Sequence, residues 1–325
     1  MNSSRFARAR RALAALGLAL ACGLAYPAGT RGLDTNQQSV RGVIRGAATA
    51  TEAIETRPAT RTEAPALATH PGRAPAIKSA AALVLDQQTG ATIFGKNTDA
   101  VLPIASITKL MTAMVVLDAN LSMHEQLLVG EDDVDTLKGT RSRLKVGTRL
   151  SREEMLRLAL MASENRAASA LSRAYPGGND AFIAAMNRKA GEIGMHDTRF
   201  LDPTGLTSAN VSTAHDLVKL VDAGFRYPAI REYSTATTYA VRINGRDQNF
   251  RNTNLLVKNG AWQIGLSKTG FINEAGRCLV MQAKLAQKNV VIVLLDSWGK
   301  YTRIGDANRI RRWLESAVLR PSVKS

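Results

Sequence analysis

The sequence predicts an α+β fold in which an antiparallel sheet is flanked by helices and carries an all-helical subdomain. Two observations support this prediction. Residues 80–94 and 262–295 contain short apolar or alternating runs separated by turn residues, the pattern of strands in a sheet. Between them, apolar residues recur at the three- and four-residue spacing of helices. This order of strands, helices and strands indicates a sheet that holds a helical insertion.

The individual elements follow from local patterns along the chain. Residues 80–85 and 91–94 are joined by Gln-Gln-Thr-Gly and form an opening hairpin. Ser151 and Glu154 make a capping box at the start of a helix. The other expected elements are helices at 179–193, 213–223 and 306–318 and a three-strand meander at 262–272, 277–286 and 289–295. A domain of about 240 residues is large enough to bury a full core.

The amino terminus predicts export. Four arginines precede the apolar run 12–25, which is too short to span a bilayer and is followed by Tyr26-Pro27. Residues 1–25 are therefore interpreted as a cleaved signal peptide, and the protein as periplasmic. Cys22 raises the alternative of a lipid anchor. That alternative is less favoured, because the large aliphatic residue that such a site has three places before its cysteine is missing.

Composition and charge divide the rest of the chain. Residues 26–76 are rich in Ala, Thr, Arg, Pro and Gly and are interpreted as a disordered tether, 77–319 as the folded domain and 320–325 as a tail. Of the net charge of +16, residues 1–78 carry +7 and leave +9 for the remainder. A basic exported domain is expected to associate with an anionic wall or membrane face. Nucleic acid is not an expected partner, because no recognised binding motif is present.

Ser106 and Lys109 form the first candidate motif. Ser-x-x-Lys also starts at Ser142 and at Ser297, but only Ser106 opens an apolar run, which extends to Val115 and predicts a helix at the centre of the domain. Ser142 is interpreted as part of a solvated basic turn, and Ser297 as part of a loop that ends a strand. Residues three apart lie on one helical face, so the Lys109 amine can reach the Ser106 hydroxyl.

Lys109 can act as a base only when its amine is uncharged. The site must therefore lower the pKa of Lys109, through burial and through a nearby like charge. Ile104 and Ile107 are expected to supply apolar walls, and Lys268 the second positive charge. On this hypothesis, Ser106 is the nucleophile and Lys109 is its base.

Ser163-Glu164-Asn165 is the second motif. It interrupts an alanine-rich helical stretch, so its first and third side chains are expected to project from a short turn between helices. The Ser163 hydroxyl can relay a proton to a leaving nitrogen, and Asn165 can hydrogen-bond a backbone amide of a peptide. A second Ser-x-Asn, at 208–210, precedes a helix cap and is interpreted as a loop.

Lys268-Thr269-Gly270 is the third and most distinctive motif. It lies in a predicted strand, 263–271, from which Lys268 must point either into solvent or into a site. Glycine weakens a strand interior and often marks the close approach of another backbone. A peptide added along this edge would present a carboxylate to Lys268 and Thr269. The competing interpretation is a glycine bend on an edge strand with a solvated lysine.

Together the motifs resemble those of the serine penicillin-binding proteins, Ser-x-x-Lys, Ser-Asp-Asn and Lys-Thr-Gly. Glu164 replaces the aspartate, at the position least needed for chemistry. Longer strings at 105–118, 163–168, 175–178, 202–206, 251–254 and 268–271 are similar to low-molecular-mass D-alanyl-D-alanine endopeptidases of the penicillin-binding protein 7 type. The resemblance covers residues 77–314 and implies a β-lactamase/transpeptidase-like fold.

The resemblance also implies a role for each motif residue. Ser106 attacks a D-alanine carbonyl, Lys109 takes its proton, and Ser163 helps to pass that proton to the departing amine. The implied substrate-binding residues are Asn165, Lys268, Thr269 and Gly270, and the backbone N–H groups of Ser106 and Phe271 are implied to hold the oxyanion. The implied partners are peptidoglycan stem peptides and, as covalent inhibitors, β-lactam antibiotics.

The reaction implied by the resemblance is D,D-endopeptidase cleavage of D-Ala-diaminopimelate cross-links. D,D-carboxypeptidase removal of terminal D-Ala remains the alternative, because both substrates carry a carboxylate on the leaving residue. A β-lactamase of the same fold is less favoured, because 198–206 lacks the Glu-x-x-Leu-Asn string that would supply a deacylating carboxylate. The intact motifs argue against a non-catalytic wall-binding protein.

No cofactor is implied and no metal site is expected, because the four histidines show no ligand spacing. His215 is interpreted as a surface residue of a helix. Once the signal peptide is removed, Cys278 has no partner cysteine in the chain. Cys278 is expected to be a buried, unreactive thiol on the core face of a strand.

Overall fold

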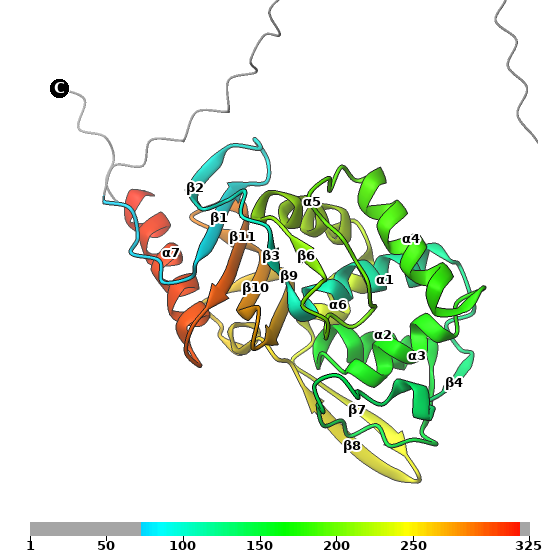
Figure 1. Cartoon of the computed structure of the whole chain (residues 1–325). Helices are drawn as coiled ribbons and strands as arrows, with labels where there is room; N and C mark the ends of the chain where they lie inside the picture. The colour runs from blue at the N-terminus through cyan, green and yellow to red at the C-terminus, as the bar shows by residue number, and fades with distance from the viewer. Residues whose placement is uncertain (1–72, 319–325) are drawn as a thin grey trace, which may run out of the picture. The chain divides into compact units, whose positions relative to one another are not determined.

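The computed structural model describes residues 73–318, whose helices and strands are labelled in Figure 1. Five antiparallel strands form the main sheet in the order β2-β1-β11-β10-β9. They are β1 (Ala81–Asp86), β2 (Thr92–Lys96), β9 (Gln263–Ile272), β10 (Gly276–Leu285) and β11 (Lys288–Ser297). The predicted α+β class is confirmed, and β1 joins the opening hairpin to the C-terminal meander by pairing with β11.

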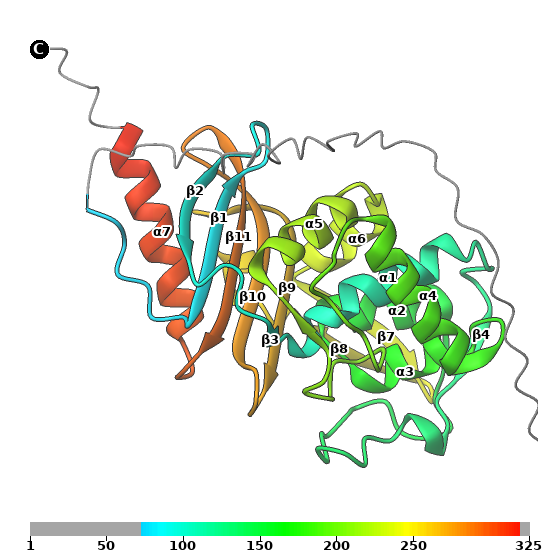
Figure 2. The same cartoon turned by 45° about the horizontal axis from the view of Figure 1, so that its top comes forward.

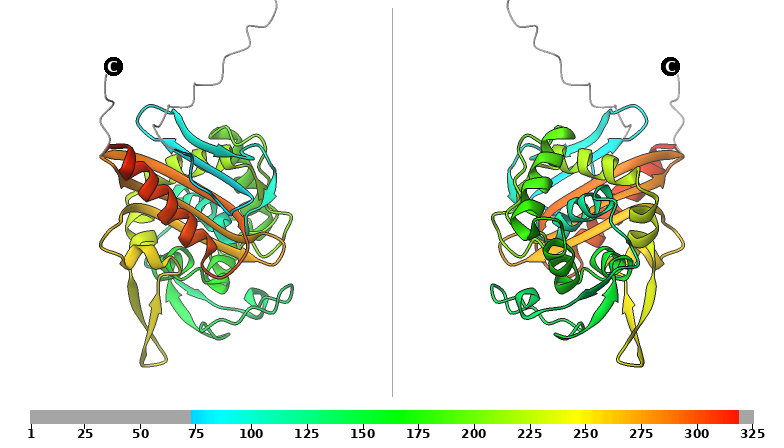
Figure 3. Two further views of the ribbon diagram at one scale, coloured as in Figure 1. Left: turned by 90° about the vertical axis from the view of Figure 1, so that its left-hand side faces the viewer. Right: turned by 90° about the vertical axis from the view of Figure 1, so that its right-hand side faces the viewer.

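Helices cover both faces of this sheet. On one face, Leu279 and Ile292 pack with side chains of α7 (Thr302–Val318). On the opposite face, Val280 and Val293 belong to the core that the sheet shares with the other helices. Figure 3 shows α7 across one face of the sheet and the remaining helices across the other. Because both faces are buried, the central strands are apolar almost throughout.

The segment between the two halves of the sheet is mainly helical. Its helices are α1 (Lys109–Asp118), α2 (Arg152–Met161), α3 (Asn165–Arg173), α4 (Gly178–Glu192), α5 (Ala214–Phe225) and α6 (Pro228–Thr235). Every side chain of α1 from Lys109 to Val116 is buried, so the central helix predicted from this apolar run is confirmed. The hydroxyl of Ser151 accepts the N–H of Glu154 at the start of α2, which confirms the predicted capping box.

Short strands and 3-10 helices complete the fold. The paired strands are β3 (Leu102–Pro103) with β6 (Val211–Ser212), β4 (Gln126–Leu128) with β5 (Arg149–Ser151), and β7 (Thr238–Ile243) with β8 (Arg246–Arg251). The 3-10 helices are η1 (Ala105–Thr108), η2 (Glu131–Asp133) and η3 (Leu255–Lys258). Neither α6 nor the β7–β8 hairpin was predicted. Asn244-Gly245 was the available signal, because both residues have positive φ in a two-residue hairpin turn.

Two element boundaries differ from the predictions by more than two residues. Ser106 lies in η1, a 3-10 turn that leads into α1, and not within the α-helix itself. Helix α7 begins at Thr302, four residues earlier than predicted. Gly299 turns the chain between β11 and α7 with a φ of 89°, and the Thr302 hydroxyl donates to the carbonyl of Trp298, so the helix starts directly after the strand.

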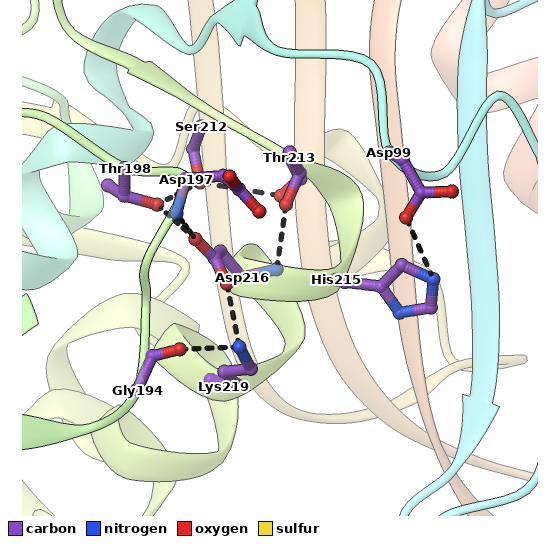
Figure 4. Close-up of polar contacts among 9 residues, drawn as sticks. All are labelled: Asp99, Gly194, Asp197, Thr198, Ser212, Thr213, His215, Asp216 and Lys219. Carbon is purple, nitrogen blue, oxygen red and sulfur yellow. Dashed lines mark hydrogen bonds and ion pairs between the residues drawn. The ribbon is translucent and has the colours of Figure 1, made fainter. Parts of the chain in front are cut away.

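The link between α4 and α5 is fastened by Asp216, which is buried in the first turn of α5 (Figure 4). Its carboxylate accepts hydrogen bonds from the Asp197 N–H at 2.8 Å, the Thr198 hydroxyl at 2.9 Å and Lys219 Nζ at 2.8 Å. His215 points away from this network towards Asp99, and its side chain is 44% exposed, which confirms its interpretation as a surface residue. The network holds the segment that carries residues 202–206 into the site.

The described chain begins close to the predicted domain boundary. Ile77 is buried, and the N–H groups of Lys78 and Ser79 donate to the carboxylate of Asp306 on α7. The expected signal peptide with Cys22, all but the last four residues of the expected tether, and the tail lie outside the described residues. Within residues 73–318, no helix has the length and apolar character that a membrane span requires.

Candidate active site

The three motifs meet where η1 and α1 approach the edge strand β9. Lys109 is fully buried, and its Nζ lies 2.9 Å from Ser106 Oγ and 2.7 Å from Asn165 Oδ1. Lys268 Nζ donates to Ser163 Oγ at 2.8 Å. Lys109 therefore joins the first motif to the second, and Lys268 joins the second to the third. The structure brings the predicted site residues into one place, although they come from a 3-10 turn, an interhelical turn and a strand edge.

Burial is the main cause of the altered pKa of Lys109. Removal from water lowers its pKa to about 7, while the carboxylates of Asp202 and Glu164 act in the opposite direction. Lys268 was expected to lower the pKa of Lys109 as a like charge. That expectation is corrected here, since burial lowers it and the charges that oppose burial come from two carboxylates.

The like-charge effect acts instead on Lys268. Its pKa lies well below the ordinary value, first because the side chain is buried and then because the charges of protonated Lys109 and of Arg303 repel a positive charge on it. Only 1% of Lys268 is exposed, so its amine points into the site and not into solvent. The strand pattern allowed Lys268 to point either into solvent or into a site, and the structure shows the second orientation.

Ser163 has a backbone conformation that is rare for a residue with a side chain. Its φ is 59°, in the turn between α2 and α3. This conformation places the Ser163 hydroxyl beside Lys268 and the following Asn165 beside Lys109. The predicted turn between helices is therefore present, and its positive φ is a local strain of the kind found at functional sites.

Gly270 allows the backbone of η1 to lie directly against β9. A Cβ atom on residue 270 would lie 2.8 Å from the carbonyl oxygen of Ile104 and 3.2 Å from the backbone nitrogen of Ser106. The prediction that this glycine marks a close backbone approach is confirmed, and the neighbour is the segment that carries Ser106. The next residue, Phe271, has its side chain half exposed at the same edge.

Sequence reasoning missed the contribution of residues 202–206. The carbonyl of Thr204 accepts a hydrogen bond from Lys109 Nζ at 2.6 Å, and the carbonyl of Pro203 accepts one from the Thr112 hydroxyl at 2.6 Å. Gly205 has a φ of +78°, and a Cβ there would lie 2.0 Å from the carbonyl oxygen of Ala105. The available signal was Pro-Thr-Gly, a turn sequence whose glycine permits this approach.

The interpretation of 208–210 as a loop is confirmed, and Asn210 has a structural task within it. Its side chain is fully buried. The amide nitrogen donates to Asp202 Oδ1 at 2.7 Å and to the Thr108 hydroxyl at 3.0 Å. Asn210 thus fastens the turn at 202–206 to η1.

A segment that we call the strap, residues 135–143, lies beside Asn165. The Thr140 hydroxyl accepts a hydrogen bond from Asn165 Nδ2 at 3.0 Å, and Lys138 pairs with Glu274 in the β9–β10 turn at 2.5 Å. The Ser142 hydroxyl donates to Glu164 Oε2 at 2.6 Å. Ser142 is therefore half-buried at the site and not in a solvated turn. Glu164, which we took to be the least needed position, is buried and acts on the pKa of Lys109.

Arg303 is a further residue that sequence reasoning missed. It lies in the first turn of α7, and its Nη1 donates to the carbonyl of Gly270 at 2.9 Å and to that of Cys278 at 3.2 Å. Burial lowers the pKa of Arg303 to about 10. Nothing in the local sequence distinguishes it from the other arginines of this basic helix. Cys278 is buried, as predicted, and burial raises the pKa of its thiol to about 11.

A cavity of about 440 Å³ adjoins the site at Asn165. It is lined by the start of the strap, by η2 and α3, and by residues 202–204 and 206. The Thr269 hydroxyl donates to the Thr253 hydroxyl at 2.7 Å on the other side of the site. In the part of the chain that the structure describes, no group of His, Cys, Asp or Glu side chains is arranged to hold a metal ion.

Comparisons with known proteins agree with this geometry. A family model described as D-alanyl-D-alanine carboxypeptidase matches residues 68–299. A D-alanyl-D-alanine endopeptidase of Pseudomonas aeruginosa is 51% identical over 74% of this chain and 78% of its own, and one of Escherichia coli is 48% identical over 76% and 80%. The Streptomyces K15 DD-transpeptidase structure has a TM-score of 0.70 at 27% identity and covers 75% of this chain and 100% of its own. This likeness confirms the transpeptidase-like fold.

Proposed function

Because the chain belongs to the D-alanyl-D-alanine carboxypeptidase family, as its motifs predicted, we propose that it hydrolyses peptidoglycan stem peptides through an acyl-enzyme on Ser106. One observation carries the assignment of the nucleophile. Lys109 is fully buried with its Nζ 2.9 Å from Ser106 Oγ, and burial brings its pKa to about 7. A lysine in this setting is uncharged often enough to remove a proton from the serine.

The oxygens around Lys109 orient its lone pair. An uncharged amine has two N–H groups and one lone pair. Asn165 Oδ1 and the Thr204 carbonyl, at 2.7 and 2.6 Å, have no proton and therefore accept the two N–H groups. The lone pair is left to accept the proton of Ser106 Oγ. Asn165 and the 202–206 turn thus support the serine-lysine pair by directing the base.

The proposed reaction proceeds in two balanced steps. Ser106 Oγ attacks the carbonyl carbon of a D-alanine as its proton passes to Lys109, and the oxyanion is held by the N–H groups of Ser106 and Phe271. The C–N bond then breaks, and the departing amine receives a proton by way of Ser163. In the second step, water attacks the ester carbon as its proton passes to Lys109. The C–O bond to Ser106 then breaks, Lys109 returns the proton to Ser106 Oγ, and the acid is released.

Lys268 and Thr269 are proposed to bind the carboxylate of the leaving residue. A substrate carboxylate beside Lys268 would favour its charged form and offset the effect of burial. Ser163, bonded to Lys268 at 2.8 Å, would then lie between this carboxylate and the breaking bond. Gly270 lets the backbone that carries Ser106 lie against β9. Because β9 is an edge strand, its free side is offered to the substrate backbone for pairing.

D,D-endopeptidase cleavage of D-Ala-diaminopimelate cross-links is the favoured activity. The support is the similarity to relatives named endopeptidase over about three quarters of the chain. D,D-carboxypeptidase removal of terminal D-Ala is the second candidate, because the family description and more distant relatives carry that name. Both reactions use the same carboxylate clamp, so they differ in the space given to the leaving group.

We further propose that the protein acts in the periplasm after removal of residues 1–25, with residues 26–76 as a tether. The support is the arginine-preceded apolar run at the amino terminus. The basic net charge supports association with an anionic wall or membrane face. β-Lactams, which mimic D-Ala-D-Ala, are expected to label Ser106 covalently.

The test compares the protein with its Ser106→Ala variant. Each is incubated with fluorescent penicillin and with cross-linked muropeptide dimers. Persistent labelling and dimer cleavage, both lost in the variant, are the expected results. Release of terminal D-Ala without dimer cleavage would favour the carboxypeptidase, and rapid turnover of the antibiotic would indicate a β-lactamase. Absence of labelling would contradict an acyl-enzyme on Ser106.

A further inference from the structure

Residues 251–254 belong to the strings that resemble the family, yet the proposed mechanism gives them no role. They read Arg-Asn-Thr-Asn and connect β8 to η3. Asn252 is buried, and its Nδ2 donates to the Ser234 carbonyl at 2.9 Å while its Oδ1 accepts the N–H of Asn254 at 2.8 Å. These bonds fix the backbone on both sides of Thr253.

Thr253 connects two parts of the candidate active site. Its N–H donates to the carbonyl of Met161 at 3.1 Å, at the end of α2 and two residues before Ser163. Its hydroxyl accepts a hydrogen bond from the Thr269 hydroxyl at 2.7 Å and donates to the same Met161 carbonyl at 3.5 Å. The contacts of Thr253 therefore run from the Lys-Thr-Gly strand to the segment that carries Ser163.

The side chains of Lys268 and Thr269 reach this segment together, although neighbouring residues of a strand point to opposite faces. Their strand, β9, is the edge of the main sheet, and Figure 2 shows it as the strand nearest the helical segment. Lys268 Nζ crosses this edge to Ser163 Oγ. Thr269 crosses it to Thr253, which is bonded to the residue two places before Ser163. The amine and the hydroxyl are therefore both on the free side of β9.

The backbone of β9 shows where this free side is open. The Ser267 N–H donates to the Ser234 hydroxyl at 3.3 Å, so the backbone groups of Ser267 face the free edge and α6 covers them. Backbone groups alternate between the two sides of a strand, so those of Thr269 and Phe271 face the same edge. Lys268 Nζ donates to the Thr269 carbonyl at 2.9 Å, in agreement with this register. The part of the edge beyond α6 therefore begins at Thr269.

Thr269 needs a partner that selects its rotamer. A threonine carries a methyl and a hydroxyl on the same carbon, and the two groups are close in size. Packing alone therefore distinguishes poorly between the rotamer that turns the hydroxyl to the free edge and the one that turns the methyl there. The 2.7 Å hydrogen bond to Thr253 selects the hydroxyl. That branch is the one that can donate to a carboxylate.

We propose that Thr253 is a positioning residue for the carboxylate clamp, an inference that rests on the proposed function. When the carboxylate of the leaving residue binds, the Thr269 hydroxyl hydrogen turns to it. The Thr253 hydroxyl then turns from the Met161 carbonyl and donates to Thr269. The bond that Thr253 gives up is long, at 3.5 Å, and the hydroxyl pair that it keeps is close, at 2.7 Å. Both hydroxyls stay paired with and without substrate, because each can donate and accept.

Two substitutions of Thr253 separate its hydroxyl from its shape. Thr253→Val keeps the branched shape and presents a methyl to Thr269, and Thr253→Ser keeps the hydroxyl. Both should fold with a cooperative urea transition, because the backbone bond to Met161 does not involve the side chain. Thr238→Val, at an exposed threonine of β7, is the matched control.

The kinetic test uses the full chain with penicillin, whose carboxylate corresponds to that of the leaving residue, and with penicillin methyl ester, which has none. Thr253→Val should lower the rate of Ser106 acylation by penicillin about tenfold and that by the ester less than about twofold. Thr253→Ser should restore most of the penicillin rate. With cross-linked dimers, the loss should be in KM and not in kcat, because the clamp holds the carboxylate before and during the reaction.

A double-mutant cycle tests whether Thr253 acts through Thr269. In Thr269→Val there is no hydroxyl to position, so the further change Thr253→Val should have little additional effect on the penicillin rate. Losses that multiply would show that Thr253 acts independently of Thr269, and they would overturn the proposal.

A binding test separates this proposal from the proposed function. In Ser106→Ala, calorimetry compares a pentapeptide that ends in D-Ala-D-Ala with the same peptide as its carboxamide. Adding Thr253→Val should weaken binding of the acid about tenfold and leave that of the carboxamide unchanged. A wild-type chain that is neither labelled nor active would contradict the proposed function, while this difference in binding would still support the clamp.

Three results would overturn the positioning role. The first is an equal effect of Thr253→Val on the acid and on the ester or carboxamide. The second is an unchanged penicillin rate and unchanged binding in Thr253→Val. The third is a Thr253→Ser variant as impaired as Thr253→Val, which would assign the loss to side-chain shape.

Discussion

The amine of Lys109 lies among three oxygen atoms, of which only Ser106 Oγ has a proton to give away. The other two, on Asn165 and Thr204, are 56 and 95 residues away in sequence. At the residue scale, the proposed chemistry therefore depends on atoms that distant segments deliver to a buried amine. The pKa of that amine is a balance between burial and two carboxylates.

This balance makes a prediction about pH. Acylation needs uncharged Lys109, so its rate should rise as pH increases through about 7 and level off above it. Glu164 raises the pKa of Lys109, so Glu164→Gln should move the midpoint to lower pH. The measurement is the second-order rate of penicillin labelling between pH 5 and 9. Glu192→Gln, at an exposed site on α4, is the control, and a midpoint that moves to higher pH would contradict the argument.

Gly205 makes a second prediction at this scale. Gly205→Ala forces a side chain into positive φ and drives a Cβ to 2.0 Å from the Ala105 carbonyl oxygen, so we expect a loss of about 4 kcal/mol or more. Gly90→Ala has a similar φ but nothing within 4 Å, and should cost about 1–2 kcal/mol. Urea denaturation measures both. Equal losses would show that the close approach at residue 205 is unimportant.

At the element scale, the strap and η2 connect the helical subdomain to the site. Asp133 in η2 is buried and accepts hydrogen bonds from the Gly130 N–H, the Ser169 hydroxyl and Arg173, each at 2.8 Å. The strap itself is held by more exposed contacts, including the Lys138–Glu274 pair. The strap is therefore attached less firmly than η2, which precedes it in the chain.

The two ion pairs should respond differently to mutation. Asp133→Ala leaves the Arg173 guanidinium, whose side chain is 40% exposed, and the half-buried Ser169 hydroxyl without their partner, so we expect a loss of about 1–3 kcal/mol. Glu274→Ala removes an exposed pair and should leave the unfolding midpoint unchanged within error. Urea denaturation at two salt concentrations is the measurement. A large effect of Glu274→Ala that persists in high salt would contradict this ranking.

At the scale of the whole molecule, α7 closes the domain against its own beginning. Ser79 donates from its N–H and its hydroxyl to Asp306 Oδ2, at 2.7 and 2.6 Å, and its hydroxyl lies 2.6 Å from that of Ser297. Asp306 is fully buried. Residues just before β1 therefore contribute to the folded domain, whereas the predicted boundary at residue 77 stays a prediction.

Two truncations test that boundary. A chain that starts at residue 75 keeps Ile77 and Ser79 and should unfold at the same temperature as the full chain, with equal penicillin labelling. A chain that starts at residue 80 loses the hydrogen bonds to Asp306 and should be less stable, because a buried carboxylate loses donors. Thermal unfolding of both distinguishes the two. Equal unfolding temperatures would place the start of the domain after residue 79.

Much of the fold could be predicted because its signals are local. The apolar run after Ser106 predicted the buried α1, and alternating strands predicted the sheet and its hairpins. The Ser163 turn and the close approach at Gly270 also followed from local sequence. Arg303 could not be found in this way, since its burial arises only where α7 docks on the sheet. The like-charge effect was expected on Lys109 and acts on Lys268, because the relative burial of the two amines is not visible in a sequence.

The sequence by itself determined the family, the fold class and the identity of the three motifs, because these depend on residue type, spacing and periodicity. Only the tertiary structure decided the electrostatics of the site. The pKa of Lys109 depends on the atoms that surround its amine and exclude water from it. These include the carbonyl of Thr204, which accepts one of its N–H groups, and the carboxylates of Glu164 and Asp202 act on the same amine. The amine loses its water only because segments that are distant in sequence pack around it. No local sequence pattern predicts that packing.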